Sequence, residues 1–266
     1  MTKAWVFTGC GSLGGWQCGA GQVLAAKEGY PAQLYGISSG AVNAVAFGFS
    51  GALKAAEFWS SVNQFSDVFT PNYFRLLSKD GVFRLSKKLV KAIDEVTARG
   101  YASTPTTIWT MDVENGEAIR HDFNTQNICR NVSQLTRASC SIPGIVESCS
   151  GRVDAGFRLL APLKAAIEDG HDEITLISGR PLVEPTIRPN LVIPAAAAAY
   201  QAVDVALSEI LRRDINECLY RNTVLGFKQI KLRIIAPTHS LGGPLSFDKC
   251  REFLKQGRTF ASNSLS

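Results

Sequence analysis

Short apolar runs alternate with longer helical patterns from the start of the chain. Residues 4–7 are apolar and short enough for a buried strand, and a glycine-rich turn over 9–15 separates them from a helical pattern that ends near Glu28. Residues 33–35 predict a second strand, and a tight turn over 36–40 leads directly into a helix of small residues. The unit of strand, glycine turn and helix is therefore repeated.

The remainder of the chain continues this alternation and predicts the fold class. Further strands are expected over residues 107–112, 118–123, 152–154, 174–178 and 230–236. Further helices are expected over residues 53–65, 85–99, 127–139 and 199–220. Strands that alternate with helices favour an α/β fold with a mainly parallel central sheet and helices on both faces. A chain of 266 residues with 45% hydrophobic side chains suits one large domain, residues 1–266.

Composition narrows the partners and the compartment. The formal net charge of +5 comes from scattered side chains such as Lys87, Lys88, Arg212 and Arg213, so a nucleic-acid partner is not expected, whereas an anionic membrane surface suits the charge. The seven cysteines form no C-x-x-C pair, and the three histidines lie at no metal-ligand spacing. No signal-type segment precedes the first strand and no apolar run reaches membrane-spanning length. We therefore expect a cytoplasmic protein without a metal or cofactor, in contact with membranes at most peripherally.

The turn after the second predicted strand carries a candidate nucleophile. Gly36-Ile37-Ser38-Ser39-Gly40 is a G-x-S-x-G between a strand and a helix, which is the context of a nucleophile elbow. Small flanking residues allow the sharp turn that would push the Ser38 hydroxyl outward. The alternative interpretation is an ordinary tight turn between a strand and a helix.

The turn after the first predicted strand is open to two interpretations. Residues 9–14 form a G-x-G-x-x-G, which can hold the pyrophosphate of a dinucleotide at a helix N-terminus. The same backbone amides can instead form an oxyanion hole beside Ser38, because adjacent parallel strands end side by side. A dinucleotide site needs an acidic residue at the end of the second strand, yet Glu28 precedes that strand. The oxyanion hole is therefore the favoured interpretation.

A serine nucleophile needs a base, and Asp154 is the best candidate. His121, His171 and His239 are the only histidines, and none has an obvious partner at the elbow. Asp154 stands at a predicted strand end, where a carboxylate can face the turn that carries Ser38. An aspartate in that position can also simply cap a turn.

At these residues the chain resembles the patatin-like phospholipase family, whose pattern is G-G-G-x-[RK]-G, then G-x-S-x-G, then D-G-[GA]. The motifs occur in the same order here, and residues 19–24, 110–117 and 138–144 are similar as well. The resemblance implies a three-layer sandwich that hydrolyses lipid or phospholipid esters without a cofactor. It implies Ser38 as nucleophile and Asp154 as general base, without histidine. The remaining site residues that it implies are Gly9, Cys10, Gly11 and Ser12 for the oxyanion hole, and Gly36, Ser39 and Gly40 for the elbow.

The chain departs from the family pattern at three positions. Cys10 stands where the pattern has its middle glycine, Leu13 where it has a basic residue, and Ala155 where it has the glycine after the aspartate. An alanine can follow Asp154 only if the backbone there has a negative φ. Leu13 removes one possible contact to an anionic headgroup.

Two rival functions remain at this stage. Ser38, Asp154 and His239 occur in the order of an α/β-hydrolase triad, although only two strands precede the elbow here. A lipid-binding or signalling module that keeps the fold without turnover is the second rival.

An aromatic stretch between the elbow and the middle of the chain is a candidate for substrate contact. It contains Phe65, Phe69, Tyr73, Phe74 and Phe83. Core packing is the favoured interpretation, and a lid or a wall for an acyl chain is the alternative.

Overall fold

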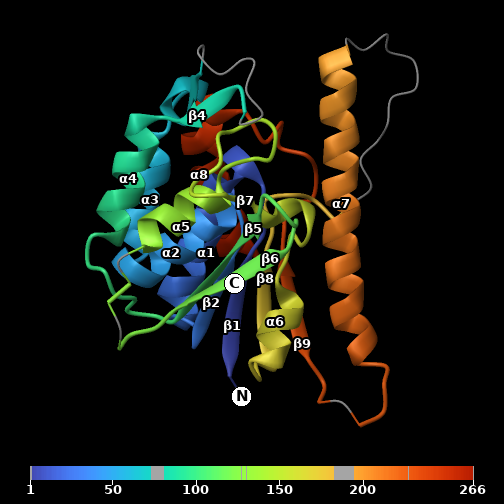
Figure 1. Cartoon of the computed structure of the whole chain (residues 1–266). Coiled ribbons are helices and arrows are strands. Elements are labelled where there is room, and N and C mark those ends of the chain that lie inside the picture. Colours follow the sequence, from blue (N-terminus) through green and yellow to red (C-terminus); the bar gives the residue numbers. More distant parts are fainter. Residues whose placement is uncertain are drawn as a thin grey trace.

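The centre of the protein is a mainly parallel β-sheet. A computed structural model describes residues 2–72, 81–126, 128–129, 131–182, 195–226 and 228–265, and within them the sheet has seven strands (Figure 1). In chain order the strands are β1 (Lys3–Phe7), β2 (Gln33–Gly36), β5 (Thr106–Asp112), β6 (Ala118–Phe123), β7 (Arg152–Asp154), β8 (Glu173–Ile177) and β9 (Lys231–Ile235). The spatial order is β6-β5-β2-β1-β8-β9, in which only β6 runs antiparallel to its neighbour.

Helices cover both faces of this sheet, as the sequence predicts. The helices are α1 (Gly14–Glu28), α2 (Ser39–Ser50), α3 (Ala52–Ser61), α4 (Lys87–Thr97), α5 (Val132–Ser139), α6 (Leu163–Glu168), α7 (Ala195–Arg221) and α8 (Cys250–Ser264). Side chains alternate between the two faces along β1. Trp5 and Phe7 join the hydrophobic cluster of α1, α2, α3 and α8, whereas Ala4 and Val6 join the cluster of α6 and α7. The fold is thus α/β in three layers.

Several predicted boundaries are wrong for local reasons. The third helix ends at Ser61 and does not reach 65, because Phe65 belongs to a separate 3-10 turn. The fourth begins at Lys87, since Leu85 ends strand β4 (Phe83–Leu85), which pairs with β3 (Phe69–Pro71). The Ser86 hydroxyl caps this helix by accepting a hydrogen bond from the Leu89 amide. The helices α6 and α8 are not predicted from the sequence. The helix predicted over 127–139 begins only at Val132, since residues 128–129 and 131 are not helical, and Asn127 itself lies outside the described residues.

Strand β7 meets β2 end to end along one edge of β5. Gly36 at the end of β2 is in register with Ile108 of β5. Asp154 at the end of β7 is in register with Thr110, two residues further along β5. Since β2 is parallel to β5 and β7 is antiparallel to it, the two strands end facing each other. This arrangement carries Asp154 to the turn that follows β2.

Candidate active site

Ser38 occupies a strained backbone position at the start of α2. Its φ is 57° and its ψ is −127°, and among the described residues only Ser150 shares a positive φ without being glycine. The elbow glycines permit this turn, because a Cβ on Gly36 would lie 2.1 Å from the Gly40 carbonyl oxygen, and a Cβ on Gly40 would lie 2.3 Å from that of Phe7. The turn is therefore sharp and strained at Ser38, and it leaves no space for a side chain at Gly36 or Gly40.

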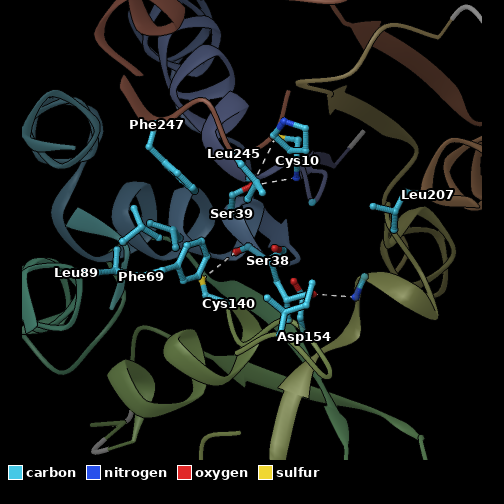
Figure 2. Close-up of a pocket in the computed structure, with 18 of the residues that line it drawn as sticks. Cys10, Ser38, Ser39, Phe69, Leu89, Cys140, Asp154, Leu207, Leu245 and Phe247 are labelled. Atoms are coloured by element: carbon cyan, nitrogen blue, oxygen red, sulfur yellow. Dashed lines mark hydrogen bonds between the residues drawn. The ribbon is translucent and has the colours of Figure 1, made fainter. Parts of the chain in front are cut away.

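Asp154 is buried beside Ser38 (Figure 2). Its amide donates to the Ser141 carbonyl oxygen at 2.8 Å, and its Oδ1 accepts from the Gly156 amide at 2.8 Å. Burial raises the pKa of Asp154 to about 6, against the opposing effects of hydrogen bonds from the Ser38 side chain and the Gly156 amide. The carboxylate is thus more basic than an ordinary aspartate, which suits proton transfer near neutral pH.

The alanine after Asp154 fits the backbone without strain. Ala155 opens a 3-10 turn (Ala155–Phe157) and has no positive φ, as the sequence requires of an alanine there. The Ala155 side chain is fully buried against the α6 and α7 face of the sheet. The departure from the family pattern at this position therefore leaves the aspartate in place.

The glycine loop after β1 lies against the elbow. A Cβ on Gly9 would be 3.2 Å from Ser38 Cβ. Gly11 has a φ of 60°, and a Cβ there would meet the Pro244 carbonyl oxygen at 2.2 Å, so a segment far away in the sequence closes over the loop. The Ser12 amide donates to that same oxygen at 2.8 Å. Leu13 is buried in the core and presents no group to the site.

The backbone amides of this loop differ in their availability. The Gly9 amide donates to the Leu160 carbonyl at 3.4 Å, and the Cys10 amide donates to Ser39 Oγ at 3.0 Å. The backbone amides of Gly11 and Ser39 have no hydrogen-bond acceptor in the described part of the chain. The Cys10 donor is held by a hydroxyl that can rotate away. The backbone amides of Gly11, Ser39 and Cys10 are thus the ones most readily available to a ligand. The Ser12 amide is instead bonded to the Pro244 carbonyl oxygen.

These residues open into an apolar cavity of about 420 Å³. The described part of the aromatic stretch lies in its wall, since Phe65, Phe69 and Phe83 all line it and pack ring to ring with one another and, except for Phe83, with Phe247. Phe69 belongs at the same time to the hydrophobic core. Tyr73 and Phe74 lie outside the described residues. The size and lining of the cavity suit a hydrocarbon chain.

No histidine lines this cavity. His239 is exposed and its Nδ1 contacts the Thr238 hydroxyl at 3.1 Å. His121, on strand β6, contacts the Thr110 hydroxyl through its Nε2 at 2.8 Å. Burial and the nearby Arg152 lower the pKa of His121 to about 4. His171 contacts Gln33 at the opposite end of the sheet. Among the described residues, Asp154 is thus the carboxylate that lines the cavity together with Ser38.

A dinucleotide and a metal both lack a suitable site in the described regions. The amides of Gly9, Cys10 and Ser12 already donate within the protein, and the Pro244 segment lies against the loop, so a pyrophosphate would have to displace these contacts. Across the residues with described side chains, no cluster of three or more His, Cys, Asp or Glu side chains is placed to hold a metal ion. The cysteines are all free thiols.

Comparison with known proteins assigns the family. The sequence model of the patatin-like phospholipase family matches residues 5–167. The chain belongs to this family. It is thereby placed among patatin-like lipid hydrolases, which act on lipid substrates.

Individual relatives are distant. No curated protein matches the sequence significantly. Among solved structures, VipD from Legionella pneumophila matches with 11% identity and a TM-score of 0.38, over 98% of this chain and 67% of that one. The family assignment rests on the match of residues 5–167.

Several residues of the site carry no signal in the sequence. Leu160 and Pro244 reach the glycine loop through backbone carbonyls, which any residue type provides. Phe247 and Leu207 enter the cavity wall from segments far along the chain. Arg180 also lines the cavity, and the turn Gly179-Arg180 after β8 resembles no motif.

Proposed function

We propose that this protein is a serine lipid acyl hydrolase of the phospholipase A or esterase type, working through a Ser38–Asp154 dyad. The observation that carries the proposal is the meeting of a strained serine and a buried carboxylate at the floor of an apolar cavity. Patatin-like membership supports the lipid substrate.

In the proposed reaction, Asp154 accepts the proton of Ser38 as Ser38 Oγ attacks the ester carbonyl carbon. The tetrahedral intermediate collapses, the ester C–O bond breaks, and the leaving alcohol takes the proton from Asp154. Water then attacks the acyl-serine ester with Asp154 again accepting a proton, and the fatty acid leaves as Ser38 regains its hydrogen.

The oxyanion of each tetrahedral intermediate would be stabilised by backbone amides of the glycine loop. The loop residues predicted for this role are Gly9, Cys10, Gly11 and Ser12, and of these the Gly11 amide is the most available. The positive N-terminal end of α2 adds to the same effect. Removing one such donor typically slows an acyl transfer about a hundredfold to a thousandfold.

The mouth of the cavity supports a lipid surface as partner. Several of its lining residues are large apolar side chains that are also solvent-exposed, namely Phe65, Ile145, Phe157, Val203 and Leu245. Apolar side chains around the entrance of an acyl cavity can enter a lipid interface, and the net charge of +5 favours an anionic one. None of the described helices has the length and apolarity to cross a membrane. We propose peripheral membrane contact through the apolar side chains at the mouth of the cavity, and the cytoplasmic location expected from the sequence stays a prediction.

Hydrolysis of a soluble ester and of phospholipid vesicles tests the proposal. Ser38→Ala and Asp154→Ala should each lower kcat/KM for p-nitrophenyl butyrate at least about a hundredfold, because each removes a group that acts in the reaction. Ser150→Ala is the matched control, since Ser150 is the other serine with positive φ and does not line the cavity. Its activity should equal that of the native protein.

Two outcomes would replace the proposal by a rival. Loss of activity in His239→Ala would favour a triad, although His239 lies outside the cavity lining. A folded native protein that binds phospholipid yet hydrolyses neither substrate would favour a lipid-binding module. In that case the hydrogen bond from the Cys10 amide to Ser39 Oγ, which occupies one proposed oxyanion donor, would be the first contact to test as the cause of inactivity.

A further inference from the structure

The cavity that contains Ser38 is lined by only two charged side chains among the described residues, Asp154 and Arg180. The proposed dyad accounts for Asp154. Arg180 has no part in it, although a guanidinium is costly to remove from water. An otherwise apolar cavity therefore keeps a positive charge that proton transfer does not need.

Arg180 is held firmly at the end of β8. The Ser178 hydroxyl accepts a hydrogen bond from the Arg180 amide at 3.1 Å and donates to the Arg180 carbonyl at 2.8 Å. The Arg180 side chain is only 7% exposed, and its Nη1 pairs with Asp204 of α7. The Arg180 Nε has no acceptor among the described residues. A largely buried guanidinium thus lines the cavity, and its buried Nε has no acceptor among the described residues.

The positive charge lies close to the glycine loop. Burial raises the pKa of the Cys10 thiol to about 11, and the nearby Arg180 charge partly opposes that rise. The preceding residue packs against the loop as well, because a Cβ on Gly179 would lie 2.6 Å from Cys10 Sγ and 2.9 Å from Leu13 Cβ. Leu13 replaces the basic residue of the family pattern. Arg180 therefore brings a cation to the same loop from another strand.

We propose that Arg180 binds the phosphate of a phospholipid whose acyl chain occupies the cavity. This inference rests on the proposed function and names its substrate class, an ester lipid with an anionic phosphate. A guanidinium presents five N–H donors in a planar fork that matches phosphate oxygens, and here the pair with Asp204 uses one side of the fork. Arg180 lines the cavity, and the apolar surroundings strengthen each charge-assisted hydrogen bond that its guanidinium makes there.

Binding to a Ser38→Ala protein tests the proposal without turnover. Octyl phosphate, octyl glucoside and inorganic phosphate are titrated by calorimetry into this protein and into the same protein with Arg180→Met added. Arg180→Met should weaken octyl phosphate at least about tenfold and leave octyl glucoside unchanged, because the variant removes only the charged contact. Arg99→Met, an exposed arginine outside the cavity, is the matched control and should change neither.

Asp204→Asn separates ligand binding from a purely structural ion pair. This variant frees the guanidinium, so octyl phosphate should bind at least as tightly as before. A loss equal to that of Arg180→Met would overturn the proposal and assign Arg180 to holding α7. Equal weakening of octyl phosphate and octyl glucoside in Arg180→Met would overturn it too. Inorganic phosphate binding as tightly as octyl phosphate would point to a free anion site unrelated to the lipid.

Failure of the proposed function would show in the hydrolysis assays and not in the binding titrations. If the proposed function fails, Ser38→Ala keeps the native esterase activity or the native protein hydrolyses neither substrate, yet the binding titrations still report on Arg180. In the active protein, Arg180→Met should lower kcat/KM at least about tenfold more for a phospholipid than for p-nitrophenyl butyrate, which carries no phosphate. An equal loss on both substrates would contradict headgroup binding.

Discussion

Two unfavourable features stand next to each other at Ser38 and Asp154. A non-glycine residue at a φ of 57° costs about 1–3 kcal/mol, and a carboxyl group buried in an apolar cavity ionises less readily than in water. The surrounding fold supplies the close packing of Gly36 and Gly40 and the register of β7 that maintain both. Such costs concentrate at functional sites, which is why the pair supports a catalytic assignment.

The raised pKa of Asp154 predicts the pH dependence of hydrolysis. A general base must be deprotonated, so activity depends on the fraction of Asp154 in its carboxylate form. With a pKa of about 6, kcat/KM for a soluble ester should be constant above pH 7 and should fall about tenfold per unit below pH 6. Stopped assays between pH 4.5 and 8.5, with circular dichroism to verify the fold, measure this. Activity that stays constant down to pH 4.5 contradicts the role of Asp154 as base.

Ser38 and Asp154 could be predicted from the sequence because each stands in a short motif at the end of a strand. Sequence reasoning could not reach Leu160, Arg180 or Pro244, whose contributions come from backbone atoms or from a position without a pattern. It also could not show that Ser39 Oγ holds the Cys10 amide, since that contact depends on the rotamer of a single side chain.

At the scale of secondary structure, α8 follows the segment that covers the glycine loop and packs against α1. It packs along α1 through close backbone contacts: a Cβ on Gly257 would lie 2.0 Å from the Trp16 carbonyl oxygen, and one on Gly19 would lie 2.1 Å from that of Leu254. The Cys250 thiol at its start donates to the Ser12 carbonyl at 3.7 Å. The position of α8 therefore sets the position of the segment over the glycine loop.

Gly257→Ala should separate α8 from α1. The added methyl group has no room beside the Trp16 carbonyl oxygen, so we expect a loss of about 2–3 kcal/mol in the free energy of unfolding, together with reduced esterase activity. Urea denaturation measures the first effect. Lys255→Ala, an exposed change on the same helix, should leave both unchanged. A stable and fully active Gly257→Ala protein would show that the close packing of these helices is unimportant.

The elements themselves were unequally predictable. The parallel strands of the central sheet follow from short apolar runs next to turn residues, because buried parallel strands leave that pattern, whereas the antiparallel strands β6 and β7 contain no such run. The helix α6 is too short for a periodic signal, whereas the buried residues of α8 recur at helical spacing over 250–261, so the sequence pattern could have indicated that helix. Strand order is a property of long-range pairing, so the meeting of β2 and β7 had to come from the structure.

At the scale of the whole molecule, side chains from both helical layers line the same cavity. Phe58 and Trp59 of α3 line it from one side, and Leu207 of α7 lines it from the other. The exposed apolar side chains at its mouth lie on loops and on α7. This arrangement predicts that lipid reaches Ser38 from a surface on which the mouth rests. The assignment of residues 1–266 to a single domain stays a prediction.

Vesicle binding should depend on the mouth and not on exposed apolar residues in general. Phe157→Ser combined with Leu245→Ser should lower the fraction of protein that sediments with anionic vesicles at least about tenfold, because both side chains are exposed and line the cavity. Leu225→Ser is the matched control, since Leu225 is 99% exposed and lies outside the cavity lining. Equal losses in the two proteins would contradict a defined lipid-facing surface.

The most direct test of the central claim is the site of covalent modification by a fluorophosphonate, located by tandem mass spectrometry. The account predicts one adduct, on Ser38, which is absent in Ser38→Ala and forms at least about a hundredfold more slowly in Asp154→Ala. Ser150→Ala should be modified at the native rate. An adduct on another residue, or a folded native protein that is not modified, would contradict the assignment of Ser38 and Asp154 as the catalytic pair.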